Sequence, residues 1–256
     1  MTGARAADPP YLASLRAGYD RAFEATVVAT PPEGVVLSQS LFYPVGGGQE
    51  ADHGTLVTPD GTRVAVVDVR RMSGAVVHRL EKGGLVRFRI GMTVRGEIDW
   101  ARRYTHMRLH TAQHLLSALA FDRYGLRTSE AAMSGHGGYL DLEGMLDGEE
   151  PIRRLEEEAN SRYFTQPVQV ESAMVSRAEF EAMPGRSSAK SLPQGISSVR
   201  LVLIEGIDRC PCGGTHVLST GEVGRVRVFR DPKGKVASTR LSFELLEERE
   251  GPPSPP

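Results

Sequence analysis

The sequence predicts an α+β protein made of a small N-terminal β-barrel followed by an antiparallel sheet with helices on one face. Short apolar runs divided by turns that contain Gly or Pro fill the N-terminal part, as in small barrels and sandwiches. A strong helical pattern begins at residue 100, and helices alternate irregularly with hairpin-forming strands after it. We therefore expect an N-terminal segment over residues 1–19, a barrel over 20–99, a second domain over 100–248 and a disordered proline-rich tail over 249–256.

The expected barrel strands are apolar runs with turn residues on both sides. They are AFEATVVAT, GVVLSQ, TRVAVVDV, GAVVHRL and MTVRGEIDW, separated by turn signals such as PPEG, PDG, RMSG and EKGG. The same region contains FYPVGGGQEADHG. Three consecutive glycines are unusual there, because a plain turn needs only one.

The helices of the second part are expected from their caps and their apolar spacing. Asp99 can cap a helix over residues 100–124 that ends at Gly125 and buries one face. A second helix fits residues 151–164, and Ser176 with Glu179 has capping-box spacing for a third. Strands are expected at 167–175, 199–205, 224–229 and 237–245.

The composition is that of an ordinary globular protein. Of 256 residues, 40% are hydrophobic and 25% are charged, with no run of about 18 apolar residues and no recognisable signal peptide. We therefore expect a cytoplasmic protein that does not enter a membrane. The net charge of −1 implies that a nucleic-acid partner would need a local basic patch.

The cysteine content points to metal binding. Cys210 and Cys212 are the two cysteines of the chain and are one residue apart, a spacing at which a disulfide is strained and closes no useful loop. Thiols in a reducing compartment are expected instead, with a metal as their partner.

Four side chains form the expected metal site. His110 and His114 are one helical turn apart, so both imidazoles share a face. Cys212 and His216 bracket a glycine turn in CPCGGTH, which lets both side chains converge. Three imidazoles and one thiolate suit tetrahedral Zn²⁺. Cys210 is ranked as a neighbour and not as a ligand.

The paired histidines do not indicate a metalloprotease. That chemistry uses HExxH, in which glutamate is the general base. Here Thr111 and Ala112 follow His110, so the carboxylate is missing.

Several motifs together resemble one family. HTAQHLLSAL and CPCGGTHV are similar to the paired HxxxH and CxxxH motifs of the alanyl-tRNA synthetase editing domain and of the stand-alone AlaX proteins. FYPVGGGQEADHG resembles the glycine-rich motif before the editing core, and STGEVG and KGK agree as well. The resemblance covers residues 20–247 and is closest to the medium-length AlaX type, because the chain ends soon after the editing core and contains no aminoacylation domain.

The resemblance implies a function and a set of ligands. It implies the threonyl/alanyl-tRNA synthetase editing-domain fold, Zn²⁺ held by His110, His114, Cys212 and His216, and hydrolysis of seryl, and also glycyl, esters on alanine tRNA. Threonine-type editing is the alternative within the family, although the CGGTH and GGGQ segments favour the alanine type. A zinc-stabilised RNA-binding module without catalysis is the alternative from another class.

Two further groups of residues are expected to touch substrate. The loop formed by Gly46, Gly47, Gly48 and Gln49 lets backbone N–H groups approach the ester or the tRNA end. The candidate partner for the serine hydroxyl is Gln49, or else the hydroxyl of Thr215 in the CPCGGTH turn. The expected contacts to the tRNA backbone are Arg102, Arg103, Arg225, Arg227, Lys233 and Lys235.

The expected reaction is attack of water on the ester that joins the amino acid to the terminal ribose. No Ser-His-Asp or Cys-His nucleophile is recognisable in the sequence, so covalent catalysis is not expected. A zinc with four protein ligands is closed. We therefore assign the metal to positioning of the substrate first and to activation of water second.

Overall fold

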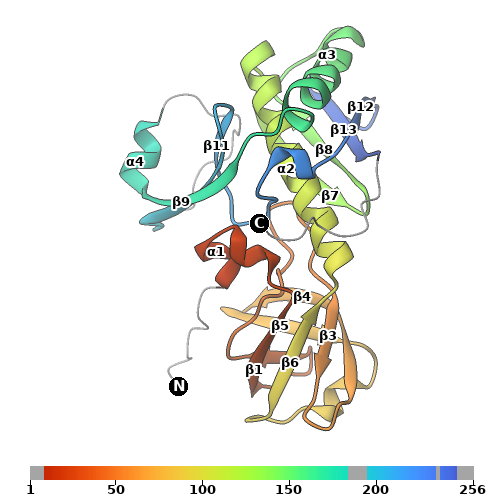
Figure 1. The fold of residues 1–256 in the computed structure, drawn as a ribbon, viewed down its shortest axis with the longest axis vertical. Coiled ribbons are helices and arrows are strands. Elements are labelled where there is room, and N and C mark those ends of the chain that lie inside the picture. Colours follow the sequence, from red (N-terminus) through yellow and green to blue (C-terminus); the bar gives the residue numbers. More distant parts are fainter. Residues whose placement is uncertain (1–8, 184–194, 235–236, 247–256) are drawn as a thin grey trace. The chain divides into compact units, whose positions relative to one another are not determined.

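Helix α2 (Trp100–Tyr124) contains the division between the two units of the structure. The computed structural model describes residues 9–183, 195–234 and 237–246 (Figure 1). The first unit covers residues 1–104 and the second covers residues 105–256. The helix has the bounds expected from the sequence. Asp99 accepts a hydrogen bond from the backbone of Arg102, and Gly125 ends the helix with a φ of 69°.

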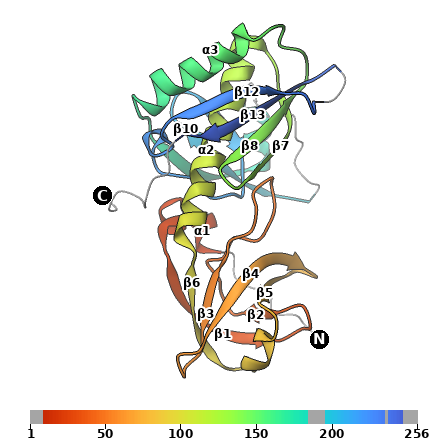
Figure 2. The same ribbon diagram turned by 90° about the vertical axis from the view of Figure 1, so that its right-hand side faces the viewer.

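The first unit is a closed barrel of six strands, in the order β1-β2-β5-β4-β3-β6, with antiparallel neighbours throughout (Figure 2). Its strands are β1 (Ala22–Ala29), β2 (Val35–Leu37), β3 (Gly54–Val57), β4 (Arg63–Met72), β5 (Ala75–Leu80) and β6 (Thr93–Ile98). Short helical pieces lie at α1 (Pro10–Ala13), η1 (Arg16–Tyr19) and η2 (Gly84–Arg87). The sequence analysis did not include β3, which is four residues long and follows the glycine-rich segment directly.

The barrel encloses its own apolar core. Along β4, Val64 and Val66 point inward with two-residue spacing, and a bulge after Val66 shifts the next buried residue to Val69. Leu56 on β3 and Val27 on β1 are fully buried in the same cluster. The inward positions thus come from every side of the barrel, as a closed sheet requires.

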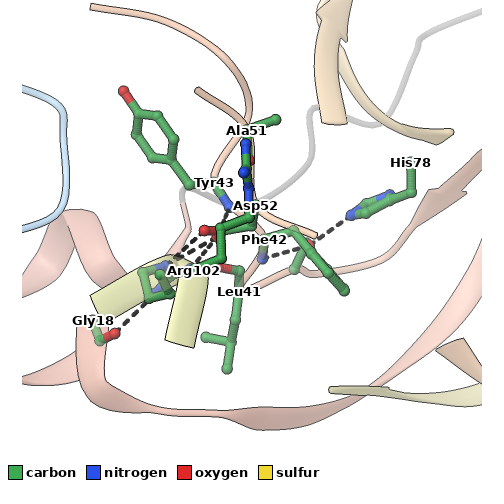
Figure 3. Close-up of polar contacts among 10 residues, drawn as sticks. Gly18, Leu41, Phe42, Tyr43, Ala51, Asp52, His78 and Arg102 are labelled. Atoms are coloured by element: carbon green, nitrogen blue, oxygen red, sulfur yellow. Dashed lines mark hydrogen bonds and ion pairs between the residues drawn. The ribbon is translucent and has the colours of Figure 1, made fainter. Parts of the chain in front are cut away.

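One titratable side chain lies inside this core. His78 on β5, whose side chain is labelled in Figure 3, is fully buried. Its Nδ1 lies 3.1 Å from the carbonyl oxygen of Val35, and its Nε2 lies 2.7 Å from the hydroxyl of Ser40. Its ring packs against that of Phe42 in a T-shaped arrangement. Burial lowers the pKa of His78 to about 4, against the opposing effect of the Val35 carbonyl. His78 is therefore a neutral hydrogen-bonding core residue at physiological pH.

The second unit has two antiparallel sheets, so the expectation of a mixed protein with antiparallel sheets is confirmed. One sheet has the order β12-β13-β8-β7 and the other β11-β10-β9. The strands are β7 (Thr128–Ser134), β8 (Gly137–Leu142), β9 (Val170–Ser176), β10 (Ser198–Ile204), β11 (Asp208–Pro211), β12 (Val226–Asp231) and β13 (Thr239–Leu245). The helices after α2 are α3 (Glu150–Glu158), the π-helical segment η3 (Ala159–Phe164), α4 (Arg177–Ala182) and η4 (Thr220–Glu222).

Helix α3 and the segment η3 cover the edge strand β12, as Figure 2 shows for α3. The Glu156 carboxylate accepts from the backbone N–H of Val228. The Asn160 side chain both donates to and accepts from the backbone of Val226. These contacts satisfy strand groups that would otherwise be an open edge.

Helix α2 is buried on more than the one face that its apolar spacing predicts. Every residue from His106 to Ala120 is buried. Ser117 accepts a hydrogen bond from Thr128 on β7, whereas Arg108 donates to the backbone carbonyl of Val223 from another side of the helix. A helix enclosed in this way forms the centre of its unit. No helix within the described residues is long and apolar enough to cross a membrane.

The burial of His78 predicts a pH dependence of stability. The folded state holds His78 neutral down to about pH 4, whereas an exposed histidine takes up a proton near pH 6.5. The resulting stabilisation is complete above about pH 6.5 and is lost as the pH falls toward about 4. An NMR titration of the His78 imidazole, assigned with a His78→Gln variant, should give a pKa of about 4. An ordinary pKa near 6.5 would contradict the buried, neutral imidazole.

Candidate metal centre

The structure brings together the four side chains expected as ligands. His110 and His114 come from α2, and Cys212 and His216 come from the turn after β11. Their ligand atoms all lie within 4.8 Å of one another. The Cys212 sulfur is 3.4 Å from Nε2 of His110 and 3.3 Å from Nε2 of His216. These four side chains can therefore hold one metal ion.

Local geometry explains the convergence. The rings of His110 and His114 are 5.2 Å apart on one face of α2, as one helical turn dictates. The ring of His216 enters from the other segment, with its centroid 4.3 Å from that of His110 and 4.7 Å from that of His114. All three histidines are buried. Buried imidazoles this close together need a shared partner, which a metal ion supplies.

Arg200 on β10 stabilises the turn from Cys212 to His216, the metal turn. Its Nη1 donates to the carbonyl oxygens of Cys212, at 2.7 Å, and of Gly214, at 3.0 Å. The backbone N–H of Gly214 in turn donates to the Cys212 sulfur. The sequence analysis did not include Arg200, because nothing in its neighbours distinguishes it from a charged strand residue.

Two ligands have side-chain partners behind them, which the sequence analysis also did not include. Nδ1 of His114 is 3.2 Å from a carboxylate oxygen of Asp208, and Nδ1 of His216 is 3.1 Å from the Thr111 hydroxyl. One signal for Asp208 exists in the sequence. It is an acidic residue four positions before Cys212, close to the CPCGGTH segment.

The electrostatics of the centre favour a thiolate. Burial alone raises the pKa of Cys212, but the charges of His110 and His216 outweigh burial and hold this pKa well below its usual value. Burial and the nearby His110 lower the pKa of His216 well below its usual value. For His114, burial lowers the pKa, but the hydrogen bond to Asp208 and the Cys212 thiolate outweigh it and raise the pKa to about 10. A deprotonated sulfur is a ready metal ligand, and metal binding would displace the proton that the raised pKa keeps on His114, which leaves three neutral imidazoles.

Cys210 lies beside the centre but in a different group. The Cys210 sulfur and the potential ligand atoms of His114 and Asp208 all lie within 4.8 Å of one another. Cys210 is not part of the group formed by the four expected ligands. Thr215, the candidate hydroxyl beside the turn, is buried next to His216.

The glycine-rich loop belongs to the first unit and forms a tight turn. The backbones of Gly46 and Gln49 exchange two hydrogen bonds, of 3.1 and 2.9 Å. Gly47 and Gly48 stand between them with φ values of 60° and 85°, a conformation that favours glycine at both positions. Gly46 and Gly47 are exposed, whereas Gln49 is buried.

A buried ion pair lies next to this turn within the same unit. Asp52, which Figure 3 shows among its partners, accepts from the backbone N–H of Tyr43 at 2.6 Å and pairs with Arg103. Arg103 also donates to the carbonyl oxygens of Gly18 and Leu41. Both side chains of the pair are fully buried. The expected contact between Arg103 and a tRNA phosphate is therefore withdrawn, because the guanidinium is enclosed and satisfied inside the protein.

The other side chains expected to contact phosphate differ in their exposure and in the partners they already have. Arg102 is held by Glu50 and by the backbone of Ala51. Arg225 and Lys233 are exposed, and Arg227 is exposed beside Glu244. Lys235 lies outside the described residues.

Curated relatives match almost the whole chain. The alanyl-tRNA editing protein AlaX-M of Methanosarcina acetivorans is 35% identical over 237 residues, which cover 90% of this chain and 96% of the relative. The chain belongs to this family of alanyl-tRNA editing proteins. The AlaX-M protein of Saccharolobus solfataricus is 32% identical over 86% of this chain and 93% of its own length.

The chain is also similar to part of larger synthetases. The alanine–tRNA ligase of Pyrococcus abyssi is 34% identical over 88% of this chain, which corresponds to 24% of the ligase. The model of the family described as tRNA synthetases class II (A) matches residues 13–102. The model of the threonyl and alanyl tRNA synthetase second additional domain matches residues 199–240, a range that contains Cys212 and His216.

The buried pair beside the glycine turn gives a stability prediction. Asp52→Asn leaves the Arg103 guanidinium buried without its counter-charge, so the free energy of unfolding should fall by about 3–5 kcal/mol. The matched control is Glu50→Gln, which removes the half-exposed partner of Arg102 and should cost about 0–1 kcal/mol. Chemical denaturation of both variants measures the difference. Equal stability of the two variants would show that the Asp52 pair does not hold this region together.

Proposed function

We propose that this protein hydrolyses the ester of mischarged alanine tRNA, with seryl-tRNA as its substrate. The observation that carries the proposal is the convergence of His110, His114, Cys212 and His216 in a chain of the alanyl-tRNA editing family. The match to the AlaX-M relatives over nearly their full length supports an activity carried by this chain.

The donor set supports zinc as the metal. Zinc bonds are about 2.3 Å to sulfur and about 2.0–2.1 Å to nitrogen, so tetrahedral coordination places a sulfur and a nitrogen ligand about 3.5 Å apart. The sulfur of Cys212 lies 3.4 Å from the nitrogen of His110 and 3.3 Å from that of His216. One thiolate and three neutral imidazoles are also the donors that zinc prefers.

The protein's part in the reaction is to position the ester and the attacking water. When bound, zinc supplies a Lewis-acid centre that orients the amino group or the ester and lowers the pKa of water. The exposed Arg225, Arg227 and Lys233 offer cations to tRNA phosphates. The tight turn at Gly46 and Gly47 offers exposed backbone to the tRNA end.

Selectivity for serine must come from hydrogen bonding. Alanine is smaller than serine, so a pocket that admits serine cannot exclude alanine by size. A polar group that pairs with the serine hydroxyl would be left unsatisfied by alanine, which makes alanine the poorer substrate. The proposed partner is Gln49 in the glycine loop or Thr215 in the metal turn.

The closed ligand set favours one alternative, a zinc-stabilised RNA-binding module without catalysis. Four protein ligands are the usual arrangement of a structural zinc site. Such a module would bind tRNA and retain zinc but would release no amino acid. Threonine-type editing is less well supported, because the full-length relatives are alanyl-tRNA editing proteins.

The choice of ester tests the proposal. Seryl-tRNA for alanine should be deacylated faster than alanyl-tRNA by a factor that can reach about 10⁴, since only serine satisfies the buried polar partner. Single-turnover deacylation rates of wild type, Gln49→Ala and Thr215→Val on both esters measure this factor. The variant that loses the hydrogen-bond partner of the serine hydroxyl should hydrolyse the seryl ester more slowly. Its ratio of seryl to alanyl deacylation rates should therefore be smaller than that of wild type. Comparable wild-type rates on both esters would defeat the proposal, because such an enzyme would destroy correctly charged tRNA.

A further inference from the structure

We propose that Asp208 and Thr111 are positioning residues of the metal centre, each of which turns one histidine so that its Nε2 faces the metal. This inference rests on the proposed zinc-dependent function and concerns residues behind the four ligands. It assigns a role to two buried polar side chains that are neither among the four ligands nor part of the glycine-rich loop.

Asp208 determines the orientation of His114. One oxygen of its carboxylate lies 3.2 Å from Nδ1 of His114, and both side chains are only 4% exposed. A carboxylate can only accept a hydrogen bond, so Nδ1 must carry the proton that it donates. The lone pair of the neutral ring is then on Nε2, which is the nitrogen left for the metal. The contact selects both the tautomer and the direction of the ring.

Thr111 plays the same part for His216. Nε2 of His216 faces the Cys212 sulfur at 3.3 Å, whereas Nδ1 lies 3.1 Å from the Thr111 hydroxyl. That hydroxyl oxygen also accepts from the backbone N–H of Val217 at 3.3 Å, so the turn and the helix are joined at this point. With Nε2 used for the metal, Nδ1–H donates to Thr111.

The two contacts cross between the segments that supply the ligands. The helix ligand His114 is oriented by a carboxylate from β11, and the turn ligand His216 is oriented by a hydroxyl from α2. Each segment therefore fixes the ligand of the other, so the two ligand pairs cannot shift independently. A buried carboxylate also balances positive charge, because one thiolate and three neutral imidazoles around Zn²⁺ carry a net charge of +1.

A second use of Asp208 is the rival explanation. His114, Asp208 and Cys210 also form a group of potential ligands within 4.8 Å. If these residues bound a second ion, Asp208 would be a ligand and not a positioning residue. The stoichiometry of bound metal separates the two explanations.

The test compares metal affinity in variants of the full chain. Asp208→Ala and Thr111→Val remove the two hydrogen bonds, and Asp208→Asn and Thr111→Ser keep an acceptor in place. Glu205→Ala, an exposed acidic residue on the same hairpin as Asp208, is the matched control. Zinc affinity is measured by competition with a chromophoric chelator. The visible spectrum of the Co²⁺-loaded protein reports thiolate ligation and tetrahedral geometry without any tRNA.

The expected result is a loss of zinc affinity of about 10–100-fold for Asp208→Ala and Thr111→Val. Most of the affinity should return in Asp208→Asn and Thr111→Ser, and Glu205→Ala should match wild type. Because Asp208→Asn keeps the shape of the side chain, its Co²⁺ spectrum separates a change at the metal from a failure to fold. Wild-type affinity and spectrum in Asp208→Ala and Thr111→Val would overturn the proposal, as would two metal ions per wild-type chain that fall to one in Asp208→Ala. Absence of metal binding in wild type would instead contradict the proposed zinc function itself.

Discussion

The centre depends on one constraint, which is that two segments 102 positions apart in the sequence must hold four ligand atoms around a single point. One helical turn fixes His110 and His114 relative to each other, and a short glycine turn fixes Cys212 and His216. Neither pair can complete a tetrahedral site alone. The remaining structure of the second unit serves to bring the two pairs together and to keep them there.

Burial of α2 on all sides meets this constraint. A helix packed on one face could tilt against its neighbours. Arg108 and Ser117 instead form hydrogen bonds with separate neighbours on different sides of α2. Arg200 holds the turn from β10 in the same way. The geometry of the ligands is thus set by hydrogen bonds to buried groups, which are costly to break because a lost partner leaves an unsatisfied polar atom in the interior.

The first unit also contains a turn whose conformation must be held by its neighbours, the glycine turn at residues 46–49. The turn needs two residues with positive φ, which Gly47 and Gly48 provide, but glycines by themselves leave the backbone flexible. Asp52 and Arg103 restrict it, because they tie the start of the loop at Tyr43 to the carbonyls of Gly18 and Leu41. The Asp52–Arg103 pair therefore restricts the conformation of the glycine-rich segment next to it.

The parts predicted from the sequence were those governed by local chemistry. Helix α2 has the expected ends because Asp99 and Gly125 act within one turn of the chain. The capping box of Ser176 and Glu179 is formed for the same reason. The four ligands come together as expected from their spacing.

The parts that the sequence analysis did not predict depend on residues far apart in the chain. Strand β8 pairs with β13 across the unit and β7 pairs with β8, and the small and polar residues of β7 and β8 give no apolar alternation. Arg103 resembled a surface cation, and only the position of Asp52 on the barrel makes it a buried partner. Asp208, Thr111 and Arg200 acquire their roles only through contacts with distant residues. Spacing along the chain therefore reveals metal ligands more readily than the residues that orient them.

In the proposed function, the four converging side chains hold a zinc ion on which tRNA deacylation depends. The most direct measurement follows zinc content and release of serine from seryl-tRNA for alanine side by side, in wild type and after removal and return of zinc. Cys212→Ala tests the ligand, and Cys210→Ala serves as its neighbouring control. We expect serine release to rise and fall with bound zinc in wild type and Cys210→Ala, and both zinc and activity to be lost in Cys212→Ala. Undiminished serine release from zinc-free, folded protein would contradict the account.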